Sequence, residues 1–239
     1  MIEHREYDAV VIGGGPSGLI AAAELAQKGI MVLVLEEHPQ IGLPDHCAGL
    51  VSISGFRRLG LDPSSESIQN LISGARLIAP NGTILEIGGK EDKAYVLNRY
   101  LFDRSLATAA TKAGVQIELN TRVTRVLREG GGVLCETSAG RSYHCRLLVD
   151  SEGISCRILK TLGLTPPSSD WVFPAVQFEI SGREFDADFV ELYLGRDVAP
   201  GFFAWSIPMS ENTSKIGLAA KGADPIEMLR GFRDRCFPA

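Results

Sequence analysis

Two apolar runs near the start of the chain enclose a glycine-rich turn and a segment with helical spacing. Residues 7–12 are mainly apolar and lead into GGGPSG. Beyond the turn, apolar positions recur at the spacing of one helix face, at Leu19, Ala22, Leu25 and Ala26. Pro16 lies just inside the expected helix start and Gly29 just past its end. The next run, IMVLVLEE, is typical of a strand buried on both faces of a parallel sheet, so the order predicts a βαβ unit.

The rest of the chain alternates strand and helix patterns and then becomes strand-rich. ARLIAPNGTILEIGG alternates around Asn81-Gly82, which predicts a hairpin. YVLNRYLFDRSLATAATKAGVQIEL predicts a helix that ends near Gly114, followed by a strand. Strands separated by glycine turns then lead to the buried run LLVD. After LTPPSSD, four strand-like segments predict an antiparallel sheet, and DPIEMLRGFRDRC predicts a closing helix.

Composition and charge exclude several classes of protein. With 24 Lys and Arg against 29 Asp and Glu, the net charge is −5, so we expect no nucleic-acid partner. No apolar run reaches the roughly 18 residues that span a bilayer, and MIEHREYD is too charged for a signal peptide, so we predict a cytoplasmic location. The five cysteines form no C-x-x-C pair, which favours reduced thiols. The histidines do not lie at ligand spacing, and no metal site is predicted.

Gly13, Gly15 and Gly18 form a G-x-G-x-x-G motif between the first expected strand and helix. The first glycine permits a tight turn, the second lets the backbone approach a pyrophosphate, and the third lets the helix pack on the strand. The helix start offers N–H groups and a positive dipole end to phosphate. Glu36 ends the second strand, where its carboxylate would accept hydrogen bonds from ribose hydroxyls and repel a 2′-phosphate. These features predict an ADP-containing cofactor, either FAD or NAD.

The wider pattern resembles a known superfamily. The N-terminal signature of FAD-dependent oxidoreductases of the aromatic-hydroxylase and glutathione-reductase superfamily is similar to the pattern formed here by Ala22, Leu25, Gly29, Val32, Val34, Glu36 and Gly42. No second G-x-G-x-x-G follows, which favours the hydroxylase-like branch with a single Rossmann domain. The resemblance implies that the cofactor is FAD.

Two later segments extend this resemblance. YVLNRYLFDRSLATAATKAGVQI resembles the family's R-x-x-F-D-x-x-L-A helix, which implies that Arg99 reaches the cofactor. LLVDSEGISCRILKTLGL resembles its A-D-G-x-x-S-x-x-R segment, with Glu152 in place of the aspartate and Cys156 in place of the serine. The resemblance implies cofactor contacts from Gly13, Gly15, Pro16, Ser17, Gly18, Glu36, Glu37, Cys47, Ala48, Gly49, Arg99, Val123, Asp150, Glu152 and Gly153.

One group within the branch is especially similar. GLPDHCAGLVS and PGFFAWSIPMSENTSKIGLAA resemble motifs of the geranylgeranyl reductases, including those that saturate archaeal lipid chains. The first is similar to their cysteine-glycine motif beside the isoalloxazine, and the second to the stretch that lines their prenyl cavity. The resemblance implies a role in lipid biosynthesis, in which reduced flavin transfers hydride to C=C bonds of a prenyl lipid or prenyl diphosphate. It also implies substrate contacts from Phe203, Trp205 and Pro208.

The aromatic stretch is expected to present two different faces. Phe203 and Trp205 lie two residues apart and share one face of a strand, while Phe202 and Ala204 share the other. We expect one face to line a lipid tunnel and the other to pack on the FAD-binding domain, although core packing explains the same pattern equally well. Pro208 is expected to end the strand because proline cannot donate to the ladder.

Reduction of an isolated C=C bond needs a proton as well as a hydride, in a cavity that excludes water. Cys47 is our candidate for the residue that donates or relays this proton, with His46 tuning the pKa of its thiol. Another interpretation makes Cys47 a small buried residue and His46 an ordinary loop histidine.

These patterns predict an α/β fold with two domains. A Rossmann-like FAD-binding domain, with a parallel sheet, helices and a β-meander, is placed at residues 1–72 and 100–165. A mainly antiparallel substrate-binding sheet domain is placed at 73–99 and 166–239. Members of the resembled group are longer and carry a G-D-A motif after the last expected helix. We therefore expect the chain to be the N-terminal part of such an enzyme or a natural truncation.

Two other functions stay open. One is a single-component FAD monooxygenase that hydroxylates an aromatic compound or a quinone. The other is non-enzymatic, a truncated fragment that only binds a nucleotide. The electron donor, either NADPH or NADH or a ferredoxin, is also open, as is a transient contact with a membrane surface.

Overall fold

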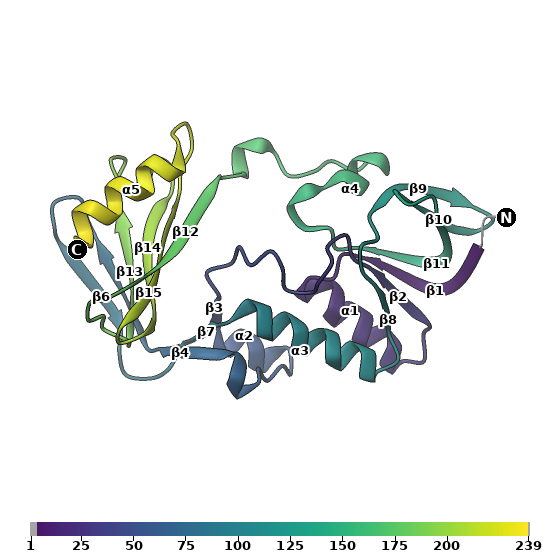
Figure 1. Ribbon diagram of the computed structural model, residues 1–239, viewed down its shortest axis with the longest axis horizontal. Helices are drawn as coiled ribbons and strands as arrows, with labels where there is room; N and C mark the ends of the chain where they lie inside the picture. The colour runs from purple at the N-terminus through teal and green to yellow at the C-terminus, as the bar shows by residue number, and fades with distance from the viewer. Residues whose placement is uncertain (1–3, 239) are drawn as a thin grey trace. The chain divides into compact units, whose positions relative to one another are not determined.

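A computed structural model describes residues 4–238 of the chain, with side chains from residue 6 onward. The protein folds into two compact units, each built from two separate segments (Figure 1). The first unit comprises the described residues up to Asp45 together with Tyr100–Pro167. The second comprises His46–Arg99 and the residues from Ser168 onward.

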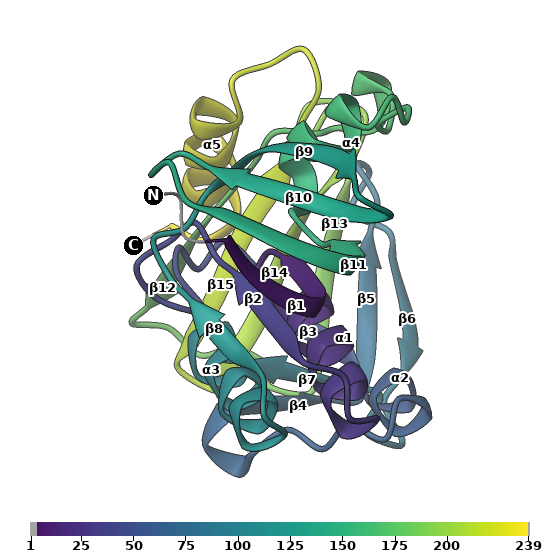
Figure 2. The same ribbon diagram turned by 90° about the vertical axis from the view of Figure 1, so that its right-hand side faces the viewer.

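The first unit contains a six-stranded sheet in the order β8-β2-β1-β11-β10-β9, seen side by side in Figure 2. Its strands are β1 (His4–Ile12), β2 (Val32–Leu35), β8 (Gln116–Glu118), β9 (Val123–Glu129), β10 (Gly132–Thr137) and β11 (Ser142–Asp150). Strands β8, β2, β1 and β11 are parallel, whereas β9, β10 and β11 form an antiparallel meander. The α/β fold with a parallel sheet and a β-meander is therefore confirmed.

The helices of this unit are α1 (Pro16–Gln27), most of α3 (Arg99–Lys112), the short α4 (Arg157–Thr161) and the 3₁₀ turn η2 (Gly153–Ser155). Both faces of β1 and β2 are buried, as the apolar run predicts. Alternate residues of β1 pack with α1 and α3 on one face and with the meander and α4 on the other. Pro16 begins α1, and α3 ends two residues before Gly114, so both predicted helices are confirmed.

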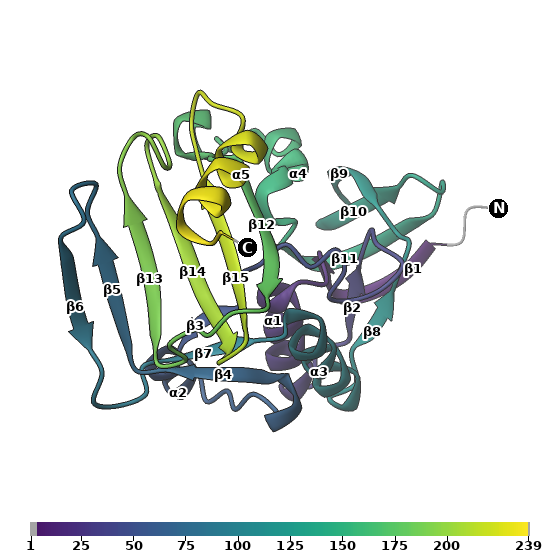
Figure 3. The same cartoon turned by 60° about the vertical axis from the view of Figure 1, so that its left-hand side comes forward.

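The second unit contains a six-stranded sheet in the order β12-β15-β14-β13-β5-β6, visible in Figure 3. Its strands are β5 (Gly74–Ile78), β6 (Ile84–Gly88), β12 (Ala175–Ser181), β13 (Phe189–Leu194), β14 (Phe203–Ser210) and β15 (Thr213–Ala219). Only the β5–β13 pair is parallel. A smaller antiparallel sheet has the order β3-β7-β4, formed by β3 (Leu50–Ser52), β7 (Ala94–Leu97) and β4 (Ile68–Ile72).

The predicted hairpin joins β5 to β6, with Ile78 opposite Ile84. Gly82 has a φ of +83°, a conformation that glycine adopts without strain. Its N–H donates to Ala79 O at 2.9 Å, and the Asn81 side chain accepts from the Thr83 amide at 3.1 Å. The Asn81-Gly82 signal is confirmed because each residue satisfies a local requirement of the turn.

The helices of the second unit are α2 (Ile53–Arg58), α5 (Pro225–Cys236) and the 3₁₀ turns η1 (Ser65–Ser67) and η3 (Ser169–Trp171). Helix α5 crosses one face of the large sheet, where Leu229 and Phe232 pack on Ala204 and Ile216 (Figure 3). Part of the opposite face is covered by the small sheet, through a core that includes Ile72, Val96, Val190, Ile207 and Met209. None of the helices in residues 4–238 combines the length and apolar character needed to cross a membrane.

The structure corrects the expectation about Pro208 in β14. Pro208 lies inside the strand rather than ending it, opposite Ser214. Pairing of β14 with β13 stops at Ser206, so the strand has a partner on one side only at Pro208, and a register shift follows. A proline is tolerated at such an edge. The face that carries Ala204 packs under α5 of the same unit.

The compact units differ from the predicted domains over residues 46–72. These residues belong to the second unit because β3 and β4 pair on either side of β7. The other break, at Pro167, falls within LTPPSSD. Which function each segment serves stays a prediction.

Phe232 should contribute strongly to the stability of the second unit. Its ring is fully buried and meets Tyr193 edge-on at 4.8 Å between centroids. We expect Phe232→Ala to lower the free energy of unfolding by about 3–5 kcal/mol in urea denaturation. Ile226→Ala, at an exposed position of the same helix, should change it by less than about 0.5 kcal/mol. Equal effects of the two substitutions would contradict the packing described.

Candidate dinucleotide-binding site

The turn between β1 and α1 is closed on one side and open on the other. Gly13 has a φ of +100°, and a Cβ there would overlap with the carbonyl oxygen of Ser151, in the loop after β11. A Cβ on Gly18 would overlap with the carbonyl oxygen of Gly13. A Cβ on Gly15, by contrast, would meet no atom within 4 Å. The structure therefore requires Gly13 and Gly18 for packing and leaves space at Gly15, where a pyrophosphate would approach.

The start of α1 is suited to an anion. Gly15 is the N-cap residue and offers no side chain to the first turn, which begins with Pro16 and contains no acidic residue. The amides of Ser17 and Gly18 therefore lie at a helix N-terminus that no side chain caps, where they can donate to phosphate oxygens. This observation, together with the space at Gly15, fits the ADP portion of FAD.

Glu36 is held against the glycine turn by hydrogen bonds. Its Oε2 accepts from the Gly14 amide at 2.6 Å, and its Oε1 accepts from the His38 amide at 2.8 Å. The His38 imidazole Nδ1 also lies 2.6 Å from Oε1. A Cβ on Gly14 would lie 2.6 Å from the end of the Ile41 side chain and 3.1 Å from Glu36 Oε2, so a larger residue there would displace these side chains. Sequence analysis identified Glu36 but missed Gly14 and His38; the GGG run was a signal for Gly14, and no pattern indicated His38.

Glu37 joins three parts of the unit through an ion-pair cluster. Its Oε2 lies 2.7 Å from both Arg122 Nε and Arg157 Nη2. Burial raises the pKa of Glu37, but the hydrogen bond and charge of Arg157, with the charges of Arg122 and His38, lower the pKa further, to below its ordinary value. The cluster ties β2 to α4 and to the residue that precedes β9.

Val123 begins β9 with its side chain buried in the core. Only its backbone is therefore suited to contact a cofactor.

The loop after β11 is organised by Glu152. Its Oε1 accepts from the amides of Ile158 at 2.7 Å and Leu159 at 3.3 Å, and its Oε2 accepts from Ser155 Oγ at 2.7 Å. Burial raises the pKa of Glu152, but these hydrogen bonds outweigh burial and the pKa is lowered. The carboxylate therefore caps α4, and its cofactor contact stays a prediction.

Asp150 ends β11 beside Gly153, which has a φ of +67°. Its Oδ1 accepts from the Glu152 amide at 3.2 Å. Burial raises the pKa of Asp150, and the nearby charge of Glu152 raises it too, although the amide hydrogen bond opposes both effects. Both residues lie at the carboxyl end of the parallel strands, where ligands bind in open α/β sheets.

The cysteine-glycine segment belongs to the second unit and is described by itself. His46 and Cys47 are exposed, so Cys47 is not the small buried residue of the alternative interpretation. The Gly49 amide donates to Cys47 Sγ at 3.4 Å. A Cβ on Gly49 would overlap with the Leu97 carbonyl oxygen, so only glycine can pack this closely against β7. Ala48 packs beside the core under the small sheet. Arg99 is the first residue of α3.

Phe203 and Trp205 share one face of β14, as predicted, with ring centroids 6.3 Å apart. Trp205 lies over Gly217, whose Cβ would stand 2.6 Å from Trp205 Cε2. Their neighbours on this face include Leu192 and Leu194, directly opposite in β13. The part of this face around the two rings is thus apolar and aromatic, and Gly217 leaves room for the indole.

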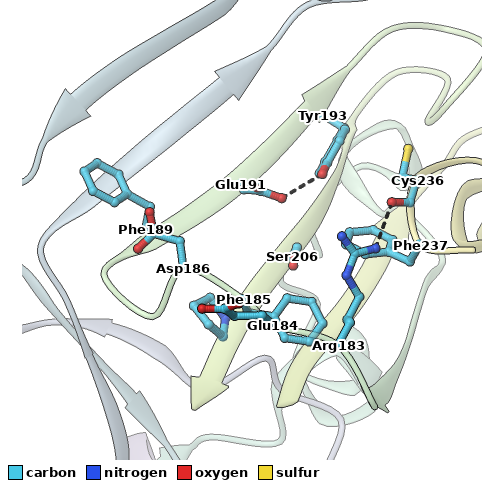
Figure 4. Close-up of a pocket in the computed structure, with 11 residues that line it drawn as sticks. Arg183, Glu184, Phe185, Asp186, Phe189, Glu191, Tyr193, Ser206, Cys236 and Phe237 are labelled. Atoms are coloured by element: carbon cyan, nitrogen blue, oxygen red, sulfur yellow. Dashed lines mark hydrogen bonds between the residues drawn. The ribbon is translucent and has the colours of Figure 1, made fainter. Parts of the chain in front are cut away.

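Pro208 does not lie with these two rings. It lines a hollow of about 130 Å³ together with Ser206, on the face that α5 crosses (Figure 4). In this hollow the Tyr193 hydroxyl donates to Glu191 Oε2 at 2.7 Å, and Arg183 Nη1 donates to the Cys236 carbonyl at 3.3 Å. Burial and the adjacent Glu191 raise the pKa of Tyr193. No sequence pattern indicates this hollow, because its residues come from separate strands and a helix.

Substitution of Gly15 should separate cofactor binding from folding. Its φ of −76° suits any residue and the space beside it is open, so Gly15→Val should fold normally while its side chain occupies the place of the pyrophosphate. We expect FAD affinity, measured by flavin fluorescence quenching, to fall by about 100-fold, roughly 2.7 kcal/mol. Gly231→Ala, in α5, has equal space and should leave the affinity unchanged. Undiminished FAD binding by Gly15→Val would contradict this location for the pyrophosphate.

The Glu37 cluster should stabilise the protein only where its carboxylate is ionised. Because the pKa of folded Glu37 lies below its ordinary value of 4.5, the stabilisation is present above pH 4.5 and is lost as pH falls through the lower, folded pKa. We expect Glu37→Gln to cost up to about 1 kcal/mol at pH 7, a modest value because the group is partly exposed, and progressively less at more acidic pH. Urea titrations at several pH values measure this. Glu24→Gln, at an exposed site of α1, should show no such trend.

Comparison with known proteins agrees with this geometry. A match to the family described as FAD binding domain spans residues 6–223. Digeranylgeranylglycerophospholipid reductase 2 of Methanopyrus kandleri is 34% identical over 224 residues, which cover 92% of this chain and 56% of the relative. Digeranylgeranylglycerophospholipid reductase 1 of Methanococcoides burtonii is 32% identical and covers 98% of this chain and 60% of the relative. The chain therefore spans less than two thirds of the length of these relatives.

Solved structures share the fold. A geranylgeranyl bacteriochlorophyll reductase-like protein from Thermoplasma acidophilum superposes with a TM-score of 0.89 at 24% identity, covering 99% of this chain and 63% of that protein. A p-nitrophenol 4-monooxygenase from Pseudomonas putida superposes with a TM-score of 0.72 at 18% identity, covering 98% of this chain and 62% of that protein. At these identities the likeness concerns the fold alone. The resemblance to the geranylgeranyl reductases is nevertheless confirmed by the relatives in sequence. The family match, together with the glycine turn and Glu36, shows that this chain belongs to the FAD-binding domain family.

Proposed function

We propose that this chain belongs to an FAD-dependent oxidoreductase that reduces C=C bonds of geranylgeranyl or other prenyl groups. The observation that carries the proposal is the identity of 34% and 32% with two proteins named digeranylgeranylglycerophospholipid reductase, over 92% and 98% of this chain. The similarity extends through both compact units, so it includes the aromatic face of β14 as well as the glycine turn. The substrate is a prenyl lipid or a prenyl diphosphate.

The residues of the first unit would hold and orient the cofactor. The uncapped start of α1 would bind the pyrophosphate over Gly15, and Glu36, already oriented by Gly14, would accept hydrogen bonds from the ribose. FAD, when bound and reduced, supplies the hydride. We propose further cofactor contacts from Arg99, Asp150 and Gly153. Val123 and Glu152 are proposed to contact the cofactor through their backbone.

The residues of the second unit would act on the substrate. Phe203 and Trp205 present an apolar aromatic face on which an isoprenoid chain can lie and from which water is excluded. Cys47 is exposed, and the Gly49 amide fixes the position of its sulfur, so its thiol is our candidate for the group that delivers a proton to the second carbon. His46 precedes it in the same exposed loop and is proposed to assist this transfer.

The electron donor and the place of reaction belong to the same proposal. A nicotinamide nucleotide or a ferredoxin would supply electrons. The edge strand β6 exposes Ile84, Leu85 and Ile87 by 58%, 58% and 54%, which supports a transient contact with a membrane surface where prenyl lipids reside.

The reductase and monooxygenase functions can be separated with chemically reduced FAD. With oxygen excluded, we expect geranylgeranyl diphosphate or a digeranylgeranyl glycerophosphate to reoxidise the flavin and to gain two hydrogens per turnover, measured by absorbance and mass spectrometry. An aromatic acid should not reoxidise it. Oxygen uptake in proportion to product would instead indicate a monooxygenase and overturn the proposal.

The role of Cys47 has its own test. Cys47→Ala should slow flavin reoxidation by about 100-fold or more while FAD affinity changes little, because loss of a proton donor affects chemistry more than binding. Cys236→Ser, at a half-buried position in α5, should keep the normal rate. An unchanged rate in Cys47→Ala would remove this residue from the mechanism.

A further inference from the structure

The imidazole of His38 lies between two carboxylates just after the end of β2. Its Nδ1 is 2.6 Å from Glu36 Oε1, and its Nε2 is 4.0 Å from Glu37 Oε1. Because an ionised carboxylate only accepts hydrogen bonds, the close contact places a proton on Nδ1, and protonation of the ring adds a second N–H at Nε2. The side chain of His38 is 44% exposed, whereas that of Glu36 is 10% exposed. The imidazole therefore has solvent to turn into, and the carboxylate does not.

The hydrogen bonds at Glu36 leave too few acceptor positions for a ribose. An ionised carboxylate offers about four lone pairs to donors. In residues 4–238 three donors use them: the Gly14 amide on Oε2, and both the amide and the imidazole of His38 on Oε1. One position, on Oε2, is left over among these contacts. The 2′- and 3′-hydroxyls of a ribose need two, so one of the three donors has to give way if both hydroxyls bind.

Only one of these donors can leave without a change in the backbone. The Gly14 amide belongs to the closely packed glycine turn. The amide of His38 belongs to a loop whose course is fixed on its other side, where the His38 carbonyl accepts from the Asn120 amide at 3.1 Å. The imidazole is attached through two rotatable side-chain bonds and is half-exposed. It is therefore the donor that a ribose hydroxyl would replace.

We propose that His38 competes with the adenosine ribose of FAD for Glu36 and thereby makes the affinity for FAD depend on pH. The inference rests on the ribose contact in the proposed function and adds a positioning residue to it. An imidazolium donates a charge-assisted hydrogen bond, roughly twice as strong as a neutral one, so the protonated ring competes better for Glu36. It also faces Glu37, whose Oε2 is held by Arg122 and Arg157. FAD therefore binds more weakly as pH falls through the range in which imidazoles titrate, about pH 8 to 5.

The first test measures FAD affinity by flavin fluorescence quenching between about pH 8 and pH 5.5, above the range in which carboxyl groups ordinarily titrate. In the unmodified chain we expect affinity to be about tenfold lower at the acid end. His38→Ala should bind FAD more tightly than the unmodified chain at every pH, with less than about twofold variation across the range. His38→Asn keeps a neutral donor near the place of Nδ1, so it should match the unmodified chain at about pH 8 and stay constant below it.

A matched control is another histidine of the same unit. His144 lies in β11, and its Nε2 is 3.3 Å from the Glu129 carbonyl oxygen, at the far end of the meander hairpin. His144→Gln should keep the pH dependence of the unmodified chain. Loss of that dependence in His144→Gln would overturn the assignment to His38.

The second test counts protons. If the protonated ring opposes FAD, then by linkage FAD must favour the neutral ring, and binding releases protons. Calorimetric titrations at about pH 6.5 in two buffers with different ionisation enthalpies should show release of a fraction of a proton per chain, and none for His38→Asn. Proton uptake would mean that the imidazolium instead attracts the cofactor, and it would overturn the proposal.

The affinity measurements distinguish the remaining outcomes. Affinity that does not change with pH, or that falls in His38→Ala at every pH, contradicts competition. If FAD binds with the expected pH dependence but no prenyl compound reoxidises it, the inference stands and the proposed reductase function fails. If prenyl compounds reoxidise a flavin whose affinity is independent of pH, the function stands and the inference fails. A chain that binds no FAD at any pH would overturn the inference together with the cofactor site.

Discussion

The hydrogen bond between the Gly14 amide and the Glu36 carboxylate, at 2.6 Å, is the constraint on which the first unit depends. It joins the glycine turn after β1 to the end of β2, so the start of α1 and the acidic residue keep one geometry. Close packing also holds the turn in place, because Gly13 contacts the loop after β11 and Gly18 contacts Gly13. Close contact at three glycines and space at the fourth, Gly15, leave an open cradle beside the turn.

The second unit relies on a division between the two faces of one sheet. On one face, α5 and the rings around Phe232 form a conventional core. On the other, the small sheet covers only part of the strands, and the rest carries Phe203 and Trp205. Because residues alternate along β14, neighbouring positions of one motif serve a core and a candidate substrate surface.

Local chemistry explains what could be predicted from the sequence. The βαβ unit, the Asn81-Gly82 hairpin and the ends of α1 and α3 depend on residues close in the chain, and each was predicted correctly. Pro208 was assigned wrongly because its tolerance depends on where β13 stops, which only the sheet register reveals. The packing of Ala204 under α5 was not predicted because α5 follows about twenty residues later in the chain.

Parts of the candidate site could not be predicted from the sequence, because they depend on loop conformations and on contacts between distant segments. His38 meets Glu36 through a loop conformation, and Trp205 meets Gly217 through the pairing of two strands. No periodicity in the sequence encodes such pairings. The exposure of Cys47 likewise depends on which strands surround its loop, and the structure places it at the surface.

The cap that Glu152 forms on α4 also bears on how this position can change during evolution. The carboxylate reaches amides six and seven residues ahead, and the loop follows a tight path with Cys156 at a φ of +46°. Aspartate is one methylene shorter, so replacing this glutamate alone would uncouple α4 from the loop after β11. A lineage that replaces Glu152 with aspartate must therefore also change the turn at Cys156. Positions 152 and 156 are expected to vary together.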